Sequence, residues 1–312
     1  MTSGQEVSAT LAADSERLLL PRLMVGSNPF QGVSYKSEAL RREYRSRFSR
    51  PEAILEVIGH CLELGVTTAH CYARQAQVEA LKMAQARYGG LPDTVAVLPD
   101  VYEAMARQTG EMAGTATREK IKFIVRSMPR LVSAGVSGNV LPLVEEVLET
   151  EIGLVSQVHP RIILLHGMLA DMACAIRHRS VVETFIKKVR ATGAVAGLAT
   201  HNLGVMWRNL TAMELSVPVI MAPFNPLGFM MNPSVDACLD VAGDRGSTLI
   251  IAKKVLAGGV IEPEGALRYV FEEVGVESAA IGVATIEEAE KTFGAARSIL
   301  GDDFDRRYEI AS

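Results

Sequence analysis

The sequence has few cysteines, no excess of basic residues and no long apolar run. Its four cysteines lack C-x-x-C spacing, which is typical of reduced, buried thiols and predicts a cytoplasmic protein. The net charge of −4 argues against a dedicated nucleic-acid-binding protein. No stretch approaches the roughly 20 apolar residues that span a bilayer, so we expect no membrane partner. Nothing in the sequence indicates an oligomeric state.

The chain also lacks a linker rich in proline, glycine or serine that would divide it into domains. Short apolar runs instead alternate with longer amphipathic stretches. We expect eight strands at residues 22–28, 66–72, 94–100, 161–167, 194–202, 217–225, 247–255 and 278–284, each with a helical stretch after it. Near-continuous apolar strands of this kind are typical of a parallel sheet that is covered on both faces.

Eight strand–helix units in one chain predict an α/β protein with a (β/α)8 TIM barrel. A doubly wound sheet would place a G-x-G-x-x-G turn after its first strand, whereas this chain has "GSNPFQG" there. We expect a flexible N-terminal tail at residues 1–20 and one barrel domain at 21–312. An enlarged helical excursion is expected around 101–160.

Three of the six histidines stand at the ends of predicted strands. They are His70 in "TTAHCY", His166 in "ILLHG" and His201 in "GLATHNL". All strands of such a barrel end on one face, which carries the active site. We therefore expect one polar mouth, which would also hold Asn28, Tyr72, Asp100, Asn225 and Lys253 or Lys254.

A metal site at this mouth is not expected. The three histidines and Asp100 have the chemistry of zinc ligands, but none shows short-range spacing such as H-x-H or H-x-x-x-H. Cys71 lies beside a candidate site residue, and we interpret it as a small buried apolar side chain.

Six segments together resemble the aldo-keto reductase superfamily. In chain order they are "CLELGVTTAHCY", "ILLHG", "GLATHN", "APFNPL", "AKKVLAGG" and "GVESAAIGVATIEEAEKTF". The resemblance extends from about Leu23 to Phe293, and the last two segments are its most specific part. It implies a TIM barrel with a nicotinamide site in the mouth and a small-molecule substrate.

The family reduces carbonyl groups with an Asp, Tyr, Lys and His tetrad, of which this chain keeps half. The resemblance places Tyr72 and His166 at the tyrosine and histidine positions, whereas Thr67 takes the place of the aspartate. The strand-three lysine is absent, and Pro99 and Asp100 stand there. An ammonium group favours ionisation of a nearby tyrosine and a carboxylate opposes it, so we expect Tyr72 to be poorly activated.

The resemblance also implies an NAD(P) cofactor. Its expected contacts are Thr200, Asn202, Asn225, Lys254, Leu256, Gly258, Gly282, Thr285 and Glu288, and the expected substrate contacts are Asn28 and Gln31. The helix start after strand eight would favour anions, but Glu287 and Glu288 stand there. This pair of glutamates predicts NADH in preference to NADPH, and it also allows loss of the cofactor altogether. A further interpretation is that the two glutamates are ordinary first-turn helix residues.

Two classes of chemistry stay open, with the first slightly favoured. The first is an NAD(P)-dependent oxidoreductase with a re-assigned proton donor. Tyr72 and His166 would bind the substrate oxygen, while His70, His201 or Asp100 would handle the proton. The second is a lyase, isomerase or cyclase that uses Asp100 and a histidine without nicotinamide. A binding barrel without catalysis is a third, weaker interpretation.

Overall fold

The computed structural model describes residues 18–100 and 141–311. At its centre, eight parallel strands form a closed barrel in chain order, with the last strand pairing with the first. They are β2 (Leu23–Gly26), β3 (Thr68–Tyr72), β4 (Asp93–Leu98), β5 (Ile162–Leu165), β6 (Val195–Ala199), β7 (Val219–Pro223), β8 (Leu249–Lys253) and β9 (Ser278–Gly282). The predicted TIM barrel is confirmed.

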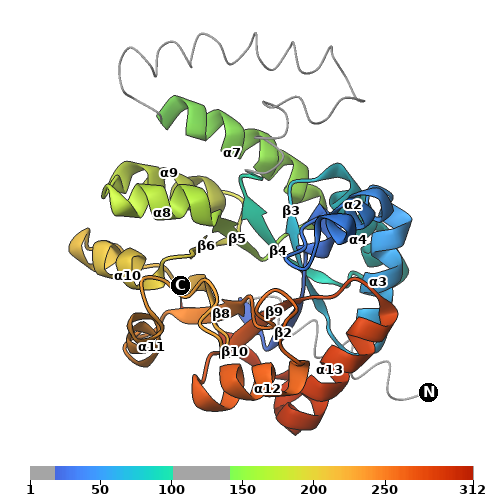
Figure 1. Ribbon diagram of the computed structural model, residues 1–312. Helices are drawn as coiled ribbons and strands as arrows, with labels where there is room; N and C mark the ends of the chain where they lie inside the picture. The colour runs from blue at the N-terminus through green and yellow to red at the C-terminus, as the bar shows by residue number, and fades with distance from the viewer. Residues whose placement is uncertain (1–17, 101–140, 312) are drawn as a thin grey trace.

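Helices surround the strands on the outside of the barrel (Figure 1). The α-helices of the described residues are α2 (Glu38–Arg47), α3 (Pro51–Glu63), α4 (Gln75–Arg87), α7 (Leu141–Val155), α8 (Gly167–Ala175), α9 (Arg179–Arg190), α10 (Leu203–Ala212), α11 (Val235–Gly243), α12 (Pro263–Arg268) and α13 (Ile286–Leu300). Shorter turns are η2 (Pro29–Gln31), η3 (Ser156–Val158), η4 (Tyr269–Glu273) and η5 (Gly301–Asp305). The sequence pattern did not predict α8, which begins directly after the fourth barrel strand.

Two three-residue strands form a separate antiparallel pair, β1 (Leu19–Pro21) with β10 (Arg307–Glu309). Leu20 and Ile310 are buried in the same cluster as the inward-facing barrel residues, so this pair closes the end of the barrel opposite the mouth. Strand β1 begins inside the stretch that we predicted as a tail. Residues 1–17 and the part of the predicted excursion at 101–140 lie outside the described residues.

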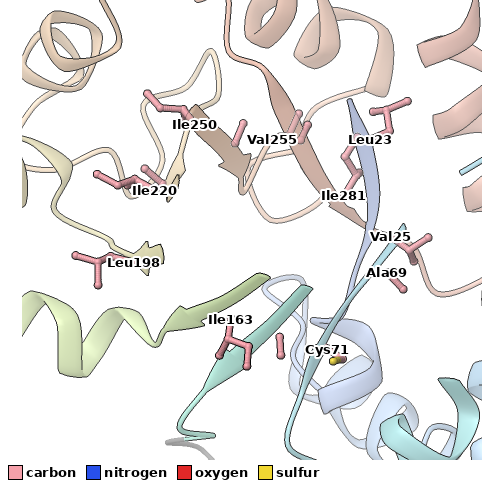
Figure 2. Close-up of a cluster of buried hydrophobic side chains, with 14 of the residues drawn as sticks. Leu23, Val25, Ala69, Cys71, Ile163, Leu198, Ile220, Ile250, Val255 and Ile281 are labelled. Carbon is pink, nitrogen blue, oxygen red and sulfur yellow. The ribbon is translucent and has the colours of Figure 1, made fainter. Parts of the chain in front are cut away.

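Side chains alternate strictly between the two faces of each barrel strand. In β4, Val95 and Val97 belong to the inner cluster, whereas Ala96 and Leu98 belong to the cluster between strands and helices. Figure 2 shows labelled members of the outer cluster on successive strands, pointing away from the barrel axis. Cys71 is one of these buried outer residues, and burial raises the pKa of its thiol to about 12.

Gly197 in β6 occupies a position with no room for a side chain. A Cβ atom there would lie 2.6 Å from both the Leu164 Cδ2 atom and the Val219 carbonyl oxygen. We expect Gly197→Ala to lower the free energy of unfolding by roughly 1–3 kcal/mol through overpacking. Gly294→Ala is the matched control, because a Cβ at Gly294 in α13 meets nothing within 4 Å and should add about 0.5–1 kcal/mol of helix stability. Urea unfolding measures both, and equal stabilities would contradict this packing.

Candidate active site

A cavity of about 320 Å³ opens at the carboxyl ends of the barrel strands, a size within the range of small-ligand pockets. The alternation along the strands decides which side chains face it. His166, His201 and Lys253 each stand two residues beyond an inward-facing residue, namely Leu164, Ala199 and Ile251. His70 and Tyr72 enter the same cavity from β3.

Tyr72 lies between two imidazoles. Its ring centroid is 5.3 Å from that of His70 and 5.9 Å from that of His166, and both pairs are edge-to-face. A residue of β3 and the residue after β5 thus both contact the tyrosine in the cavity. The half of the tetrad that the sequence retains, Tyr72 and His166, is therefore brought together in space.

The His70 side chain is neutral and held by a serine. Its Nδ1 atom lies 2.6 Å from the Ser27 hydroxyl oxygen, and burial, followed by the charge of Lys253, lowers its pKa to about 3. The serine has no other side-chain hydrogen bond in the described part of the chain, so the arrangement that satisfies its proton has Ser27 donating to Nδ1. On this ground we assign the His70 proton to Nε2, an atom that is buried without a partner among the described residues.

His166 has the same tautomer, and here the direction of the hydrogen bond is fixed because its partner is a backbone N–H. The backbone N–H of Met168 donates to its Nδ1 atom at 3.2 Å, and a ring nitrogen that accepts carries no proton. Burial and the charge of Lys253 lower the His166 pKa to about 4, so the ring is neutral near pH 7. Both histidines beside Tyr72 therefore present an Nε2–H donor.

Lys253 enters the cavity from the end of β8 and contacts the third histidine. Its Nζ atom lies 3.1 Å from the Nε2 atom of His201. Burial, with the charge of Lys253, lowers the pKa of His201 to about 3, so the imidazole accepts and the amine donates. Burial and the neighbouring Lys254 lower the pKa of Lys253 itself to about 7.

Lys254 follows in a left-handed backbone conformation, with φ of 59°. Its amine donates to the Tyr35 hydroxyl and lies 4.3 Å from the centroid of that ring. Burial lowers its pKa to about 8. Two adjacent lysines therefore give the cavity a positive charge that weakens as the pH rises above neutrality.

Asp100 lies outside the cavity that the other candidates line. It shares the outward parity of Ala96 and Leu98, and its carboxylate pairs with the Arg74 guanidinium through Nε to Oδ2 and through Nη2 to Oδ1 at 3.3 Å. The Asp100 backbone N–H donates to Glu151. This fully buried carboxylate is committed to an ion pair and cannot serve a ligand in the cavity without breaking it.

Three predicted cofactor contacts make internal hydrogen bonds instead of lining the cavity. The Thr200 hydroxyl donates to Asp171, whose other oxygen accepts from the His201 backbone N–H at 2.9 Å. The Asn202 backbone N–H donates to the Thr200 hydroxyl at 2.8 Å. The Asn225 side chain is bonded in both directions to the Phe229 backbone. These groups shape the loops after β6 and β7.

The start of α13 is capped by its own residues. Thr285 accepts from the Glu288 backbone N–H at 3.1 Å, and the Glu288 carboxylate accepts from the Ala284 N–H at 2.7 Å. This pair resembles a capping box, except that the glutamate accepts from the residue before the N-cap. These two hydrogen bonds occupy backbone amides that could otherwise bind an anion. They are the contacts expected if Glu288 serves as a first-turn residue of the helix.

Beyond the mouth, the cavity continues between the loop after β8 and the start of α13. Lys36, Lys254 and Lys291 line this arm together with Gly258 and Gly259. Lys36 and Lys254 supply two positive charges, which match the charge of a diphosphate, so these side chains fit the phosphates of a dinucleotide even though two amides at the start of α13 are taken. Lys291 is also paired with Glu262 at 2.5 Å.

The structure therefore separates the predicted site residues into two groups. Those that line the cavity are Asn28, His70, Tyr72, His166, His201, Lys254, Leu256, Gly258, Gly282 and Glu288. Those that do not are Gln31, Asp100, Thr200, Asn202, Asn225 and Thr285. Within residues 18–100 and 141–311, no group of three or more His, Cys, Asp or Glu side chains could hold a metal ion.

The motifs gave no role to Ser27, Lys36 or Lys291, and they left Lys253 as an alternative to Lys254. The alternation of Leu249, Ile251 and Lys253 along β8 is the signal that identifies Lys253 as the inward-facing lysine. Ser27 and Lys36 carry no comparable pattern, because they lie on an irregular loop.

Among the helices of residues 18–100 and 141–311, none combines the length and the apolar character that a membrane span requires.

Comparison with known proteins supports the barrel. PA4992 of Pseudomonas aeruginosa, assigned as an aldo-keto reductase, is 16% identical, with a TM-score of 0.55 over 89% of this chain and 90% of its own. Aldo-keto reductase AKR11C1 of Bacillus halodurans is 11% identical, with a TM-score of 0.53 over 80% and 84%. Bombyx mori AKR2E4, solved in complex with NADP, is 11% identical, with a TM-score of 0.50 over 88% and 84%.

Neither a protein-family model nor a curated protein matches the sequence. At these identities a structural likeness establishes the fold alone. The similarity that the motifs predicted is confirmed at that level: the chain has the barrel fold of the aldo-keto reductases.

Proposed function

We propose that the protein is an oxidoreductase that reduces the carbonyl group of a small molecule, or oxidises the corresponding alcohol, with a nicotinamide cofactor. The observation that carries the proposal is the position of Tyr72 at the barrel mouth between two neutral imidazoles. The Tyr72 hydroxyl and the imidazoles of His70 and His166 line one cavity, and all three are uncharged groups that can donate a hydrogen bond. Donors of this kind stabilise an oxyanion that develops on a carbonyl oxygen.

We assign the proton donor to Tyr72. Of the re-assigned donors predicted from the sequence, Asp100 is paired with Arg74 and His201 accepts from Lys253. His70 is neutral, and a neutral imidazole N–H is a weaker acid than a phenol. The charge of Lys253 acts on both His70 and His166, so it also favours the phenolate that a proton donation from Tyr72 leaves behind.

A bound nicotinamide would supply or accept the hydride. The residues that would hold its dinucleotide are Lys36, Lys254 and Lys291, and Gly258 and Gly259 line the same cavity. The carboxylates of Glu262 and Glu288 also line this cavity and would oppose a further phosphate on the adenosine. We therefore propose NADH in preference to NADPH.

The experiment is to follow consumption of NADH and NADPH at 340 nm with a panel of small aldehydes, ketones and 2-oxo acids. We expect NADH to be oxidised with at least one of these classes, at a higher kcat/KM than NADPH. Turnover with NADPH alone would contradict the cofactor preference. The absence of turnover with either cofactor across the panel would count against carbonyl reduction.

The buried amine of Lys253 supports a second candidate, a lyase or isomerase that needs no nicotinamide. With a pKa of about 7, part of this amine is neutral at pH 7 and able to remove a proton next to a carbonyl group. Lys253 would then take the role of base that the sequence suggested for Asp100. Deuterium exchange into the α-positions of carbonyl compounds in D2O, without any cofactor, tests this alternative.

A further inference from the structure

We propose that the barrel mouth contains a carboxylate subsite formed by Lys253 and His70, and that the substrate is a 2-oxo acid or the corresponding 2-hydroxy acid. The subsite deepens the proposed function by naming a substrate class. The carbonyl group of that substrate rests on the proposed function, whereas the carboxylate does not. Two observations carry the subsite, namely the unbalanced positive charge of the mouth and an unpartnered buried nitrogen on His70, a residue that lines it.

The positive charge of the mouth has no partner in the described part of the chain. No ion pair joins Lys253 or Lys254 to a carboxylate among residues 18–100 and 141–311. Asp171 acts on Lys253 electrostatically, but both of its oxygens are engaged, by Thr200 and by the His201 backbone. A desolvated cation that touches no carboxylate is costly, and an anionic ligand lowers that cost.

The geometry leaves donors for such a ligand. Lys253 makes one hydrogen bond to described residues, to His201, and an ammonium group has three protons to donate. His70 is 7% exposed, and its Nε2 atom is buried without a partner among the described residues. A buried donor of this kind calls for an acceptor, and a carboxylate oxygen supplies it.

The carboxylate and the reacting carbonyl must be close together. The charge of Lys253 acts on both His70 and His166, and Tyr72 lies between those two rings. The carbonyl oxygen would accept from Tyr72 and His166, while the carboxylate would accept from Lys253 and His70. A 2-oxo acid, in which one bond joins the two groups, places both among these side chains within a cavity of about 320 Å³.

A carboxylate suits this donor set better than a phosphate does. No arginine lines the cavity within the described residues, although arginine is the side chain whose planar donors best match phosphate. At the mouth the donors are neutral imidazoles, a phenol and Lys253, which balance a single negative charge. The lysines of the arm at the start of α13 are left for the cofactor.

The test uses two ligands of the same shape that differ by one charge. Oxamate carries a carboxylate beside a carbonyl group, and oxamide carries a neutral amide in its place. Isothermal titration calorimetry of the full chain at about pH 6.5, without nicotinamide, measures both. We expect oxamate to bind at least about tenfold more tightly than oxamide, since a hydrogen bond to a charged group contributes roughly that factor or more.

Variants assign the effect to Lys253. Lys253→Met should weaken oxamate binding by a factor on the order of 10–100, and Lys253→Arg should restore part of it by keeping the charge. Lys82→Met is the matched control, because Lys82 lies on α4 and pairs with Glu79 on the surface; it should bind oxamate as the wild type does. Circular dichroism melts verify that each variant is folded.

Three results would overturn the subsite. They are equal affinity for oxamate and oxamide, no oxamate binding up to about 10 mM, and wild-type oxamate affinity in folded Lys253→Met. Displacement of oxamate by inorganic phosphate at concentrations below the oxamate Kd would overturn the choice of carboxylate. Because the titrations contain no cofactor, oxamate binding without any NADH turnover would refute the redox proposal and leave the subsite standing. Reduction of uncharged aldehydes without oxamate binding would refute the subsite and leave the redox proposal standing.

Discussion

Replacing Tyr72 by phenylalanine is expected to lower kcat for carbonyl reduction by about 10²–10⁴-fold, the range that loss of acid–base assistance typically causes. KM should change much less, because His166 still donates to the carbonyl oxygen and the carboxylate contacts are unchanged. The removed atom is the one that we assign as the proton donor. Its ring would stay packed between the two imidazoles, so the loss reports on chemistry and not on folding.

The control for this prediction is Tyr88→Phe. Tyr88 follows α4 and packs between helices, near Gly59, away from the residues that line the cavity. Steady-state kinetics with NADH and the best substrate of the panel should give wild-type kcat for this variant. Unchanged turnover of Tyr72→Phe would remove the tyrosine from the mechanism and direct attention to the cofactor-free alternative.

The pH dependence of a 2-oxo acid reduction should show a falling limb above neutrality. Lys253 has a lowered pKa of about 7, so its ammonium is present below pH 7 and is lost as the pH rises through that value. If the ammonium binds the substrate carboxylate, kcat/KM should fall by about tenfold for each pH unit above pH 7. Glyoxylate, the smallest 2-oxo acid, is a suitable substrate for the profile.

The other titratable groups near Lys253 do not reverse this predicted fall of kcat/KM with rising pH. The imidazoles of His70, His166 and His201 have pKa values of about 3 to 4 and stay neutral across the profile. Lys254 has a pKa of about 8, and its titration removes more positive charge in the same direction. Burial raises the pKa of Asp171 from its usual value near 3.8.

Lys253→Arg provides the decisive comparison for the pH profile. Arginine stays charged over the whole range, so the falling limb should move to higher pH in this variant. A limb that instead rises through pH 7 in the wild type would identify the neutral amine as the active form. That result would contradict the ammonium role and favour the proton-transfer alternative.

The barrel itself could be predicted from the sequence for a physical reason. Each barrel strand is buried on both faces, so it reads as a short apolar run, and each helix between strands carries an amphipathic pattern. The strands β1 and β10 are three residues long and leave no such pattern. Their pairing depends on the two ends of the chain meeting in space.

The candidate site was only partly predictable. Strand parity, followed through Leu164 to His166 and through Ile251 to Lys253, selects the side chains that face the axis. The same parity turns Asp100 outward, but only the fold brings Arg74 next to it. Sequence alone could not show that Thr200 and Asn225 would be engaged by Asp171 and by the Phe229 backbone, because those partners are set by loop geometry.

Direct titration with a reduced nicotinamide cofactor tests the central claim most directly. The purified full chain is titrated with NADH and then with NADPH, and the nicotinamide fluorescence is followed at each addition. The proposed function predicts a saturable enhancement with a Kd between about 1 μM and 1 mM, with NADH bound more tightly. No change in nicotinamide fluorescence with either cofactor up to millimolar concentration would contradict it.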